Sequence, residues 1–248
     1  MSAEVLVHED ILWHDAECGG YGDDLALWSQ LAERAAGDVL DLGCGTGRVA
    51  LDLAARGHHV WGLDLEPHLV EALAARAAER GLEVEALAGD CRRLDLGRRF
   101  ALAIAPMQLV QVLGGMTDRR AFLVGVREHL EDGGLLAAAI VEGVPPAAFV
   151  GGDNVTPDVR EASGTIYSSL PLGTTIRDGA LEIRRLRQVI PPAGDIREHV
   201  HTDRLDILDA GALEAEAGAC GLEAAGRLDI PAGADHVGST VVVLERRG

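Results

Sequence analysis

The sequence predicts an α/β protein with a doubly wound, mainly parallel seven-stranded sheet, a C-terminal antiparallel hairpin strand and an inserted antiparallel β lid. Two observations lead to this prediction. Between residues 38 and 141, short apolar runs alternate with segments of helical apolar spacing, which is typical of a parallel sheet covered by helices. From residue 144 to about residue 204 the helical spacing is lost, and strand-like runs punctuated by Gly and Pro follow one another. We therefore expect residues 1–142 and 205–248 to form one domain and residues 143–204 to form the lid.

The elements of the first part follow in chain order. A helix opens after Asp23 and Asp24, because acidic residues precede an apolar helical spacing there. We expect strands at the apolar runs 39–42, 59–64, 82–87, 100–105 and 135–141. Between them we expect helices at residues 49–54, 67–80 and 118–130, the second with a proline in its first turn. Residues 132–134, Asp-Gly-Gly, are expected to turn the chain into the fifth strand.

The second part is expected to supply the lid and the closing hairpin. Strand-like runs occupy residues 165–170, 181–190 and 196–203. A helix at 208–220 ends at Gly221, and two runs at 222–230 and 239–246 read as the hairpin, with its turn at 231–238.

Charge and composition exclude several classes of protein. The chain has 248 residues with 40 acidic and 22 basic ones, a formal net charge of −18, and every basic residue is an arginine. Without lysine there is no Schiff-base lysine and no phosphate-cradling Walker loop. The negative charge argues against nucleic acid as a partner and favours a neutral or cationic small molecule.

The remaining composition points to a cytoplasmic protein. No apolar run approaches the ~18 residues that a membrane helix needs, and residues 1–10 lack the basic and apolar regions of a secretory signal. Four cysteines, at positions 18, 44, 91 and 220, stand far apart without a CxxC pair, which is typical of free intracellular thiols. We expect no membrane partner and allow for a homodimer.

The chemistry is expected at the carboxyl ends of the strands, where open parallel sheets bind ligands. Four features fall there in order: a glycine turn after the first strand, Asp64 after the second, Asp90 and Cys91 after the third, and Pro106-Met107-Gln108 after the fourth. Asp64 is placed to accept hydrogen bonds from ribose hydroxyls.

The glycine spacing bears on the choice of cofactor. The dinucleotide fingerprint is GxGxxG, whereas this turn reads GxGxG over residues 43–47 and continues with Arg48. The compact turn suits a cofactor with an amino-acid tail and no pyrophosphate. A dinucleotide, and a tight turn without any ligand, are the two alternatives.

At these residues the sequence resembles the class I S-adenosylmethionine-dependent methyltransferases, from about residue 21 to residue 141 and more loosely from residue 208 to the end. Residues 39–47, VLDLGCGTG, match that family's first motif. The resemblance implies S-adenosyl-L-methionine as cofactor, with its methionine part held by the backbone of residues 43–47, its ribose by Asp64, and its adenine by Leu65, Asp90 and the Cys91 amide. The full set of expected cofactor-binding residues is Tyr21, Asp41, Gly43, Cys44, Gly45, Gly47, Asp64, Leu65, Asp90, Cys91, Arg92, Pro106 and Met107.

The sequence departs from the family pattern at three places. Glu66 follows Leu65 where a serine is usual, and the fourth strand opens Phe100-Ala101 in place of Phe-Asp. The Asn/Asp-Pro-Pro-Tyr sequence of enzymes that methylate nucleic-acid bases is missing, since residues 105–108 read APMQ. This argues further against a nucleic-acid acceptor. The inserted strands resemble, in topology only, the lid of small-molecule N- and O-methyltransferases of the glycine and sugar-amine type.

Methyl transfer from a sulfonium is an in-line displacement that needs chiefly a held acceptor and excluded water. His236, with Asp235 beside it, is the expected base, against the alternative of a solvated turn histidine. Gln108 and Gln111, one helical turn apart, are expected to bind the acceptor or the cofactor amino group; the alternative is a helix surface. Tyr21 is expected over the cofactor carboxylate.

Two further groups of polar residues are not expected to bind a ligand. His199 and His201 alternate on an expected strand, but no third ligand lies at useful spacing, so we expect no metal. Three arginines of the expected lid, at positions 184, 185 and 187, are expected to face solvent.

The sequence thus predicts a methyltransferase that moves a methyl group from S-adenosylmethionine to N or O of a small molecule. One alternative is a catalytically silent S-adenosylmethionine-binding protein. The other is a nicotinamide-dependent reductase, which the glycine spacing and the missing Tyr-xxx-Lys pair disfavour.

Overall fold

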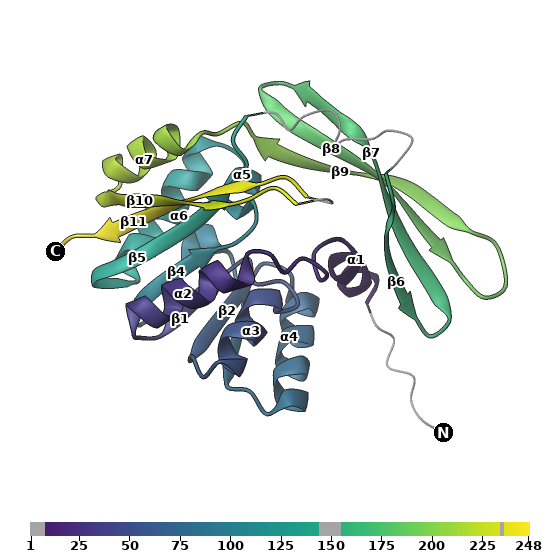
Figure 1. The fold of residues 1–248 in the computed structure, drawn as a ribbon, viewed down its shortest axis with the longest axis horizontal. Coiled ribbons are helices and arrows are strands. Elements are labelled where there is room, and N and C mark those ends of the chain that lie inside the picture. Colours follow the sequence, from purple (N-terminus) through teal and green to yellow (C-terminus); the bar gives the residue numbers. More distant parts are fainter. Residues whose placement is uncertain (1–7, 144–154, 234–235) are drawn as a thin grey trace.

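The computed structural model describes residues 8–143, 155–233 and 236–248, which form two sheets (Figure 1). The main sheet has seven strands in the order β10-β11-β5-β4-β1-β2-β3, and the lid sheet has four in the order β6-β7-β8-β9. The strands of the main sheet are β1 (Val39–Leu42), β2 (Val60–Asp64), β3 (Val84–Ala88), β4 (Phe100–Ala105), β5 (Leu130–Ile140), β10 (Leu222–Ile230) and β11 (Ser239–Arg246). Those of the lid sheet are β6 (Asp158–Ala162), β7 (Thr165–Arg177), β8 (Ala180–Ile190) and β9 (Arg197–Asp206).

Helices cover both faces of the main sheet. Trp28, Leu53 and Leu73 belong to the apolar layer under α2, α3 and α4, whereas Phe122 and Leu213 belong to the layer under α5, α6 and α7. The helices are α1 (Glu9–Glu17), α2 (Leu25–Ala35), α3 (Arg48–Ala55), α4 (Pro67–Arg80), α5 (Leu109–Val112), α6 (Met116–Glu128) and α7 (Ala210–Ala219), with a short 3-10 turn η1 (Cys91–Arg93). No helix in the described part of the chain is both long and apolar enough to cross a lipid bilayer.

The pairing of the strands positions the site. β1 pairs in parallel with both β2 and β4. On one side of β1 the sheet continues through β2 to β3, and on the other side it continues through β4 to β5. β11 runs antiparallel to β5, and β10 runs antiparallel to β11. The predicted fold class is therefore confirmed. The crevice where the strand order reverses lies at the carboxyl ends of β1 and β4, where open sheets bind ligands.

Several predicted elements differ from the structure. The last helix before β5 ends at Glu128, and β5 begins at Leu130, so residues 131–134 are part of the strand and not a free turn. They form an irregular segment: Phe100 pairs with Leu130, but Leu102 already pairs with Leu135. The apolar pattern does not predict β6, because only five residues take part and three of them are charged.

Helix α1 is the largest element that the sequence does not predict. It buries only Leu12 and Trp13, so its apolar period is too short to stand out. Trp13 packs edge-on against Tyr167 of β7, with ring centroids 5.3 Å apart. Figure 1 shows α1 between the lid sheet and α4, and contacts join it to β6, β7 and α4. The N-terminal segment thus links the lid to the main domain.

Two of the lid arginines face inward, contrary to the prediction. Arg187 donates to both carboxylate oxygens of Glu17 in α1, at 2.8 and 2.6 Å, and Arg185 donates to Ser169 at 2.8 Å. Arg184 is exposed, as predicted. The partial burial of Arg185 and Arg187 follows from the carboxylate that α1 brings to this face, since a guanidinium withdrawn from solvent needs a partner.

A buried ion cluster ties the end of the lid to the main domain. Arg119 of α6 is almost fully buried and donates to both oxygens of Glu216, at 2.9 and 2.8 Å, and to Asp206 at the end of β9. Glu142, on the other side of the insert, accepts from the Ala210 amide at 2.8 Å. These contacts hold together the two points where the lid leaves and rejoins the sheet.

Replacing Arg119 should destabilise the protein strongly. Arg119→Ala leaves two carboxylates buried without a cation, and breaking such a cluster costs about 3 kcal/mol. Urea unfolding followed by circular dichroism measures this loss. The matched control is Arg56→Ala, whose partner Asp52 lies one helical turn away on the surface, and which should change the free energy of unfolding by less than about 0.5 kcal/mol. Equal losses in the two variants would contradict the role of the cluster.

Candidate functional site

The glycine turn after β1 is tightly packed. Gly45 has φ 54°, and a Cβ atom there would lie 2.1 Å from Nε2 of His14. A side chain at this position is therefore excluded both by backbone conformation and by the α1 helix. The glycine motif and helix α1, which the sequence does not predict, therefore contact each other at Gly45.

The amides of residues 43, 44, 45 and 47 in this turn donate within the protein. Those of Gly43 and Cys44 donate to the Leu63 carbonyl at 2.8 and 3.1 Å, and that of Gly47 donates to the Cys44 carbonyl at 3.0 Å. The Gly45 amide donates to the carboxylate of Asp64 at 2.8 Å. Phosphate-binding turns instead point free N–H groups at the ligand. The turn therefore suits close approach of a ligand without a pyrophosphate.

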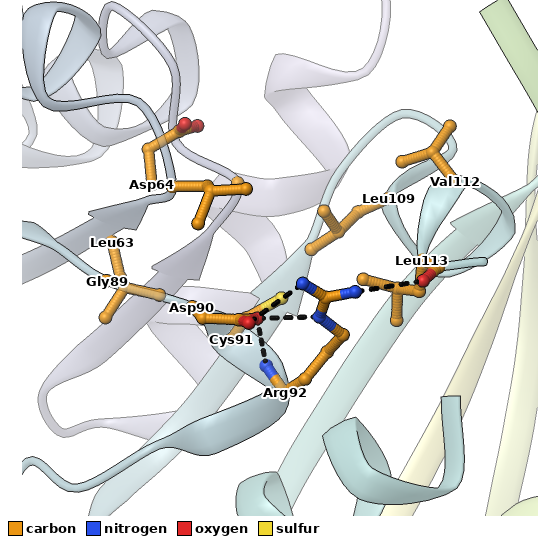
Figure 2. A pocket seen from close by; sticks show the side chains of 11 residues that line it. Leu63, Asp64, Gly89, Asp90, Cys91, Arg92, Leu109, Val112 and Leu113 are labelled. Atoms are coloured by element: carbon orange, nitrogen blue, oxygen red, sulfur yellow. Dashed lines mark hydrogen bonds and ion pairs between the residues drawn. The ribbon is translucent and has the colours of Figure 1, made fainter. Parts of the chain in front are cut away.

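A first cavity of about 220 Å³ lies beside this turn, between the ends of β2 and β3 and helix α5 (Figure 2). It brings together six residues that the sequence assigns to the cofactor: Gly43, Asp64, Leu65, Asp90, Cys91 and Arg92. Apolar side chains close its other side, namely Leu63, Leu109, Val112 and Leu113. The cavity thus combines two carboxylates with an apolar wall, as a nucleoside requires.

Arg92 forms an ion pair with Asp90 at the wall of this cavity. Its Nε and Nη2 donate to the two oxygens of Asp90 at 2.8 and 2.9 Å, and its own amide donates to the same carboxylate at 2.9 Å. Asp118 holds the third guanidinium nitrogen at 3.0 Å, and Figure 2 shows the Asp90–Arg92 pair at the cavity wall. The hydrogen bonds from Arg92 lower the pKa of Asp90 below its ordinary value. Asp90 is thus kept ionised and able to accept.

A second cavity of about 810 Å³ lies between the main domain and the lid. It brings together Tyr21, Met107, Gln108 and His236, all predicted site residues, and its lid wall includes Arg185. The Tyr21 and His236 rings meet edge to face at 4.6 Å. Burial, followed by the charge of Asp24, raises the pKa of Tyr21 to about 12, so the phenol stays protonated at neutral pH and can donate but cannot act as a base.

The carboxylate beside His236 is Asp23. Its Oδ2 lies 2.9 Å from His236 Nε2. Asp235, which the sequence suggests as the partner, lies outside the described residues. The sequence places Asp23 at a helix start, and nothing in its spacing relates it to position 236, which is 213 residues away along the chain.

Asp41 lies behind the glycine turn and lines neither cavity. Its carboxyl group is fully buried, and neither oxygen has a hydrogen-bond partner among the described residues. Burial raises the pKa of Asp41 to about 7, with Arg48 opposing the shift and Asp64 adding to it. The turn is therefore backed by one carboxyl group, that of Asp41, whose ionised form has little compensation among the described residues.

Several other predicted cofactor residues contribute backbone or packing and do not line the cavities. The Cys44 side chain packs into the core against Gly62, and burial raises the pKa of its thiol. Gly45, Gly47 and Pro106 likewise lie outside both cavity walls. For these residues the family pattern reflects the shape of the turn.

Helix α1 supplies a second set of contacts to the turn. Thr46 Oγ1 donates to Asp15 at 2.8 Å and lies 3.3 Å from His14 Nδ1, while Arg76 of α4 holds Asp15 from the other side at 2.9 Å. Burial lowers the pKa of His14, which keeps its ring neutral at physiological pH. Sequence reasoning missed these residues; the signal was the acidic pair Glu9-Asp10 before Leu12 and Trp13.

Gln111 is not available to a ligand, contrary to the prediction. Its side chain is buried, donates to the carbonyls of Val141 and Asp206 at 3.1 and 2.9 Å, and accepts from the Val141 amide at 2.8 Å. The amide joins the end of β5 to the end of the lid. Gln108, at the start of α5, does line the second cavity.

The described residues contain no group of three or more His, Cys, Asp or Glu placed to hold a metal ion. His201 instead lies 3.1 Å from Asp203 on the same strand.

Residues 39–134 match a family model described as a methyltransferase domain. Among curated proteins, the chain is 33% identical over 117 residues to the cypemycin N-terminal methyltransferase of a Streptomyces species, covering 46% of each chain. It is 25% identical over 114 residues to a ubiquinone biosynthesis O-methyltransferase of Rickettsia conorii, covering 46% of this chain and 38% of the relative. The chain therefore spans less than half the length of these relatives.

Solved structures resemble the whole chain. The sugar N-methyltransferase KedS8 from a Streptoalloteichus species superposes with a TM-score of 0.76 at 17% identity, over 100% of this chain and 96% of its own. The amino pentose methyltransferase CalS10 from Micromonospora echinaspora, solved with bound S-adenosylmethionine, superposes with a TM-score of 0.66 at 24% identity, over 92% and 93%. At these identities the likeness establishes the fold, lid sheet included.

Removing the Gln111 amide should cost stability and leave cofactor binding intact. Gln111→Ala exposes no ligand contact but leaves buried backbone groups of residues 141 and 206 unpaired, at about 2 kcal/mol. Urea unfolding measures the loss, and titration with S-adenosylhomocysteine measures binding. Gln188→Ala, at a surface pair with Glu198, is the control for loss of a glutamine. Lost binding with unchanged stability would restore the predicted ligand contact.

The buried Asp41 should make stability depend on pH. Its pKa of about 7 exceeds the unfolded value, so the folded state holds a proton that the unfolded chain releases, and this stabilisation is lost as the pH rises through 7. Asp41→Asn should therefore gain about 2 kcal/mol relative to the wild type between pH 5 and pH 8. Denaturant unfolding at both values measures the change. Asp229→Asn, at an exposed position, should show no such gain. If the free energies of unfolding of Asp41→Asn and of the wild type changed in parallel with pH, the raised pKa of Asp41 would be refuted.

Proposed function

We propose that this chain, whose residues 39–134 match a methyltransferase-domain model, is an S-adenosylmethionine-dependent methyltransferase acting on N or O of a small molecule. The observation that carries the proposal is the glycine turn, whose amides are spent internally beside a cavity with two carboxylates. This arrangement fits a nucleoside that has no phosphate.

The first cavity would hold the adenosine part of the cofactor. Asp64 would accept from the ribose hydroxyls, Leu65 would cover the adenine, and Asp90, held ionised by Arg92, would accept from the exocyclic amine. The methionine part would lie along the turn toward Tyr21 and the second cavity. The poorly compensated carboxyl of Asp41 supports a cofactor that carries an ammonium and a sulfonium.

The second cavity would hold the acceptor. Bound S-adenosylmethionine supplies a methyl group on a positively charged sulfur, which is activated for in-line displacement. The protein's own task is to orient the acceptor and exclude water, which the lid and α1 do from two sides. His236 would take the acceptor's proton, and Gln108 would orient the acceptor through its amide.

The net charge and the free cysteines support the proposed partner and the proposed cellular location. The net charge of −18 supports a small neutral or cationic acceptor over nucleic acid. All four cysteines are free, which supports a cytoplasmic location. The comparisons include proteins named as N- and as O-methyltransferases, so both kinds of acceptor atom stay within the proposal.

The direct test is an assay with methyl-labelled S-adenosylmethionine and a metabolite extract. Label transferred to a small molecule, with release of S-adenosylhomocysteine, supports the proposal. Tight binding of S-adenosylhomocysteine without any transfer would point instead to a catalytically silent binding protein.

Asp64→Ala should weaken cofactor binding selectively. The loss of charged hydrogen bonds to a ribose corresponds to about 10- to 100-fold lower affinity for S-adenosylhomocysteine. Isothermal titration calorimetry measures the affinity, and thermal unfolding controls for disruption of the Gly45 contact. Glu66→Ala is the matched control, because Glu66 is an exposed acid two residues away that does not line the cavity. Equal affinities for wild type and Asp64→Ala would refute the ribose assignment.

A further inference from the structure

Asp23 and His236 come from opposite ends of the chain and meet at the wall of the second cavity. Both line the cavity, and Asp23 Oδ2 lies 2.9 Å from His236 Nε2. The ring is held from two further sides: Tyr21 packs edge to face against it, and a Cβ atom at Gly233 would lie 2.5 Å from Cε1 of the ring. The imidazole therefore sits in a defined orientation.

The geometry distinguishes the two ring nitrogens. Nε2 is excluded from solvent and completes no hydrogen bond among the described residues, so its 2.9 Å contact with Asp23 is an ion-pair contact, and the histidine side chain as a whole is 28% exposed. The accessible part of the ring is therefore the part away from Nε2. A carboxylate at Nε2 favours the tautomer with the proton on that nitrogen, and this leaves the lone pair on Nδ1.

The other charged groups around this cavity are engaged with one another. Asp24 accepts from both terminal nitrogens of Arg48, whose guanidinium also lies 5.0 Å from the centre of the Tyr21 ring. Across the cavity, the Arg185 guanidinium donates a hydrogen bond to Asp158, and its Nε lies 3.5 Å from Oε1 of Glu17. Among the described residues, Asp23 is thus the carboxylate that meets the His236 ring directly.

We propose that Asp23 is a positioning residue, which orients His236 and fixes its proton on Nε2 so that Nδ1 can take a proton from the methyl acceptor. This inference rests on the proposed function and names a residue that the motif does not contain. The logic is that of a histidine base oriented by a carboxylate, with the two partners supplied by different parts of the fold.

The proton balance is simple. The acceptor's lone pair would form a bond to the methyl carbon while the carbon–sulfur bond breaks and leaves its electron pair on sulfur; the proton on the acceptor atom would pass to Nδ1, and the imidazole would become a cation bearing protons on both nitrogens. Asp23 stabilises this cation without being protonated itself. Release of the Nδ1 proton to water through the cavity restores the starting state.

The test begins with the tautomer of His236, which can be read without any acceptor. Long-range ¹H–¹⁵N correlation spectra of the full-length labelled protein report on its nine histidines, and His236→Gln assigns the relevant signals. The wild type should show His236 with its proton on Nε2. In Asp23→Ala the tautomer ratio should move toward Nδ1–H by about 3- to 10-fold, as expected for loss of a carboxylate at ion-pair distance from Nε2.

A similar pair on the lid serves as control. His201 Nε2 lies 3.1 Å from Asp203, with comparable exposure, and neither residue lines a cavity. Asp203→Ala should change the His201 signals and leave those of His236 as in the wild type. An unchanged His236 tautomer in Asp23→Ala would overturn the proposal.

Kinetics with the acceptor found in the labelled-methyl assay provide the second readout. Asp23→Ala should lower kcat by about 10- to 100-fold with KM changed less than about twofold, and Asp23→Glu should restore part of kcat. An unchanged kcat overturns the role of Asp23 while leaving methyl transfer intact. If the wild type binds S-adenosylhomocysteine but transfers label to no acceptor, the proposed function fails and the proton-transfer role fails with it.

Discussion

The hydrogen bond from the Gly45 amide to Asp64 is the contact on which the rest of the site depends. It joins the turn after β1 to the end of β2 at 2.8 Å, across the pair of strands that starts the parallel sheet. With the Gly43 and Cys44 amides donating to Leu63, it closes the turn against the neighbouring strand. A turn closed in this way has no row of free amides to offer a phosphate, and its surface is defined by backbone in close approach to the ligand. The same bond holds the Asp64 carboxylate at the wall of the first cavity.

The second cavity is built by segments that are distant in sequence. Helix α1, the loop before α2, the end of β4, the lid and the last hairpin each supply part of its wall. Because the lid is inserted in one place, its orientation must be fixed at its two ends and along α1. Arg119, Gln111 and Glu17 do this with buried polar contacts, and each is paired, as burial of polar groups requires. The shape of the second cavity therefore depends on polar contacts outside the glycine turn.

The parts of the fold that follow a strong local rule could be predicted from the sequence. The alternation of strands and helices, the glycine turn, and Asp64 and Asp90 after their strands all depend on short-range pattern and on the edge rule for parallel sheets. What could not be predicted depends on long-range pairing. The partner of His236 is 213 positions away, and Arg185 and Arg187 are partly buried because α1 brings Glu17 to them. Gln111 was expected to meet a ligand, but the end of the lid takes up its amide.

The central claim is that the glycine turn selects a cofactor with an adenosine and an amino-acid tail, and not a dinucleotide. Isothermal titration of the full-length protein with S-adenosylhomocysteine and, separately, with NAD⁺ tests it most directly. The account predicts saturable binding of S-adenosylhomocysteine near one molecule per chain and no measurable heat from NAD⁺. Tight binding of NAD⁺ with none of S-adenosylhomocysteine would contradict it.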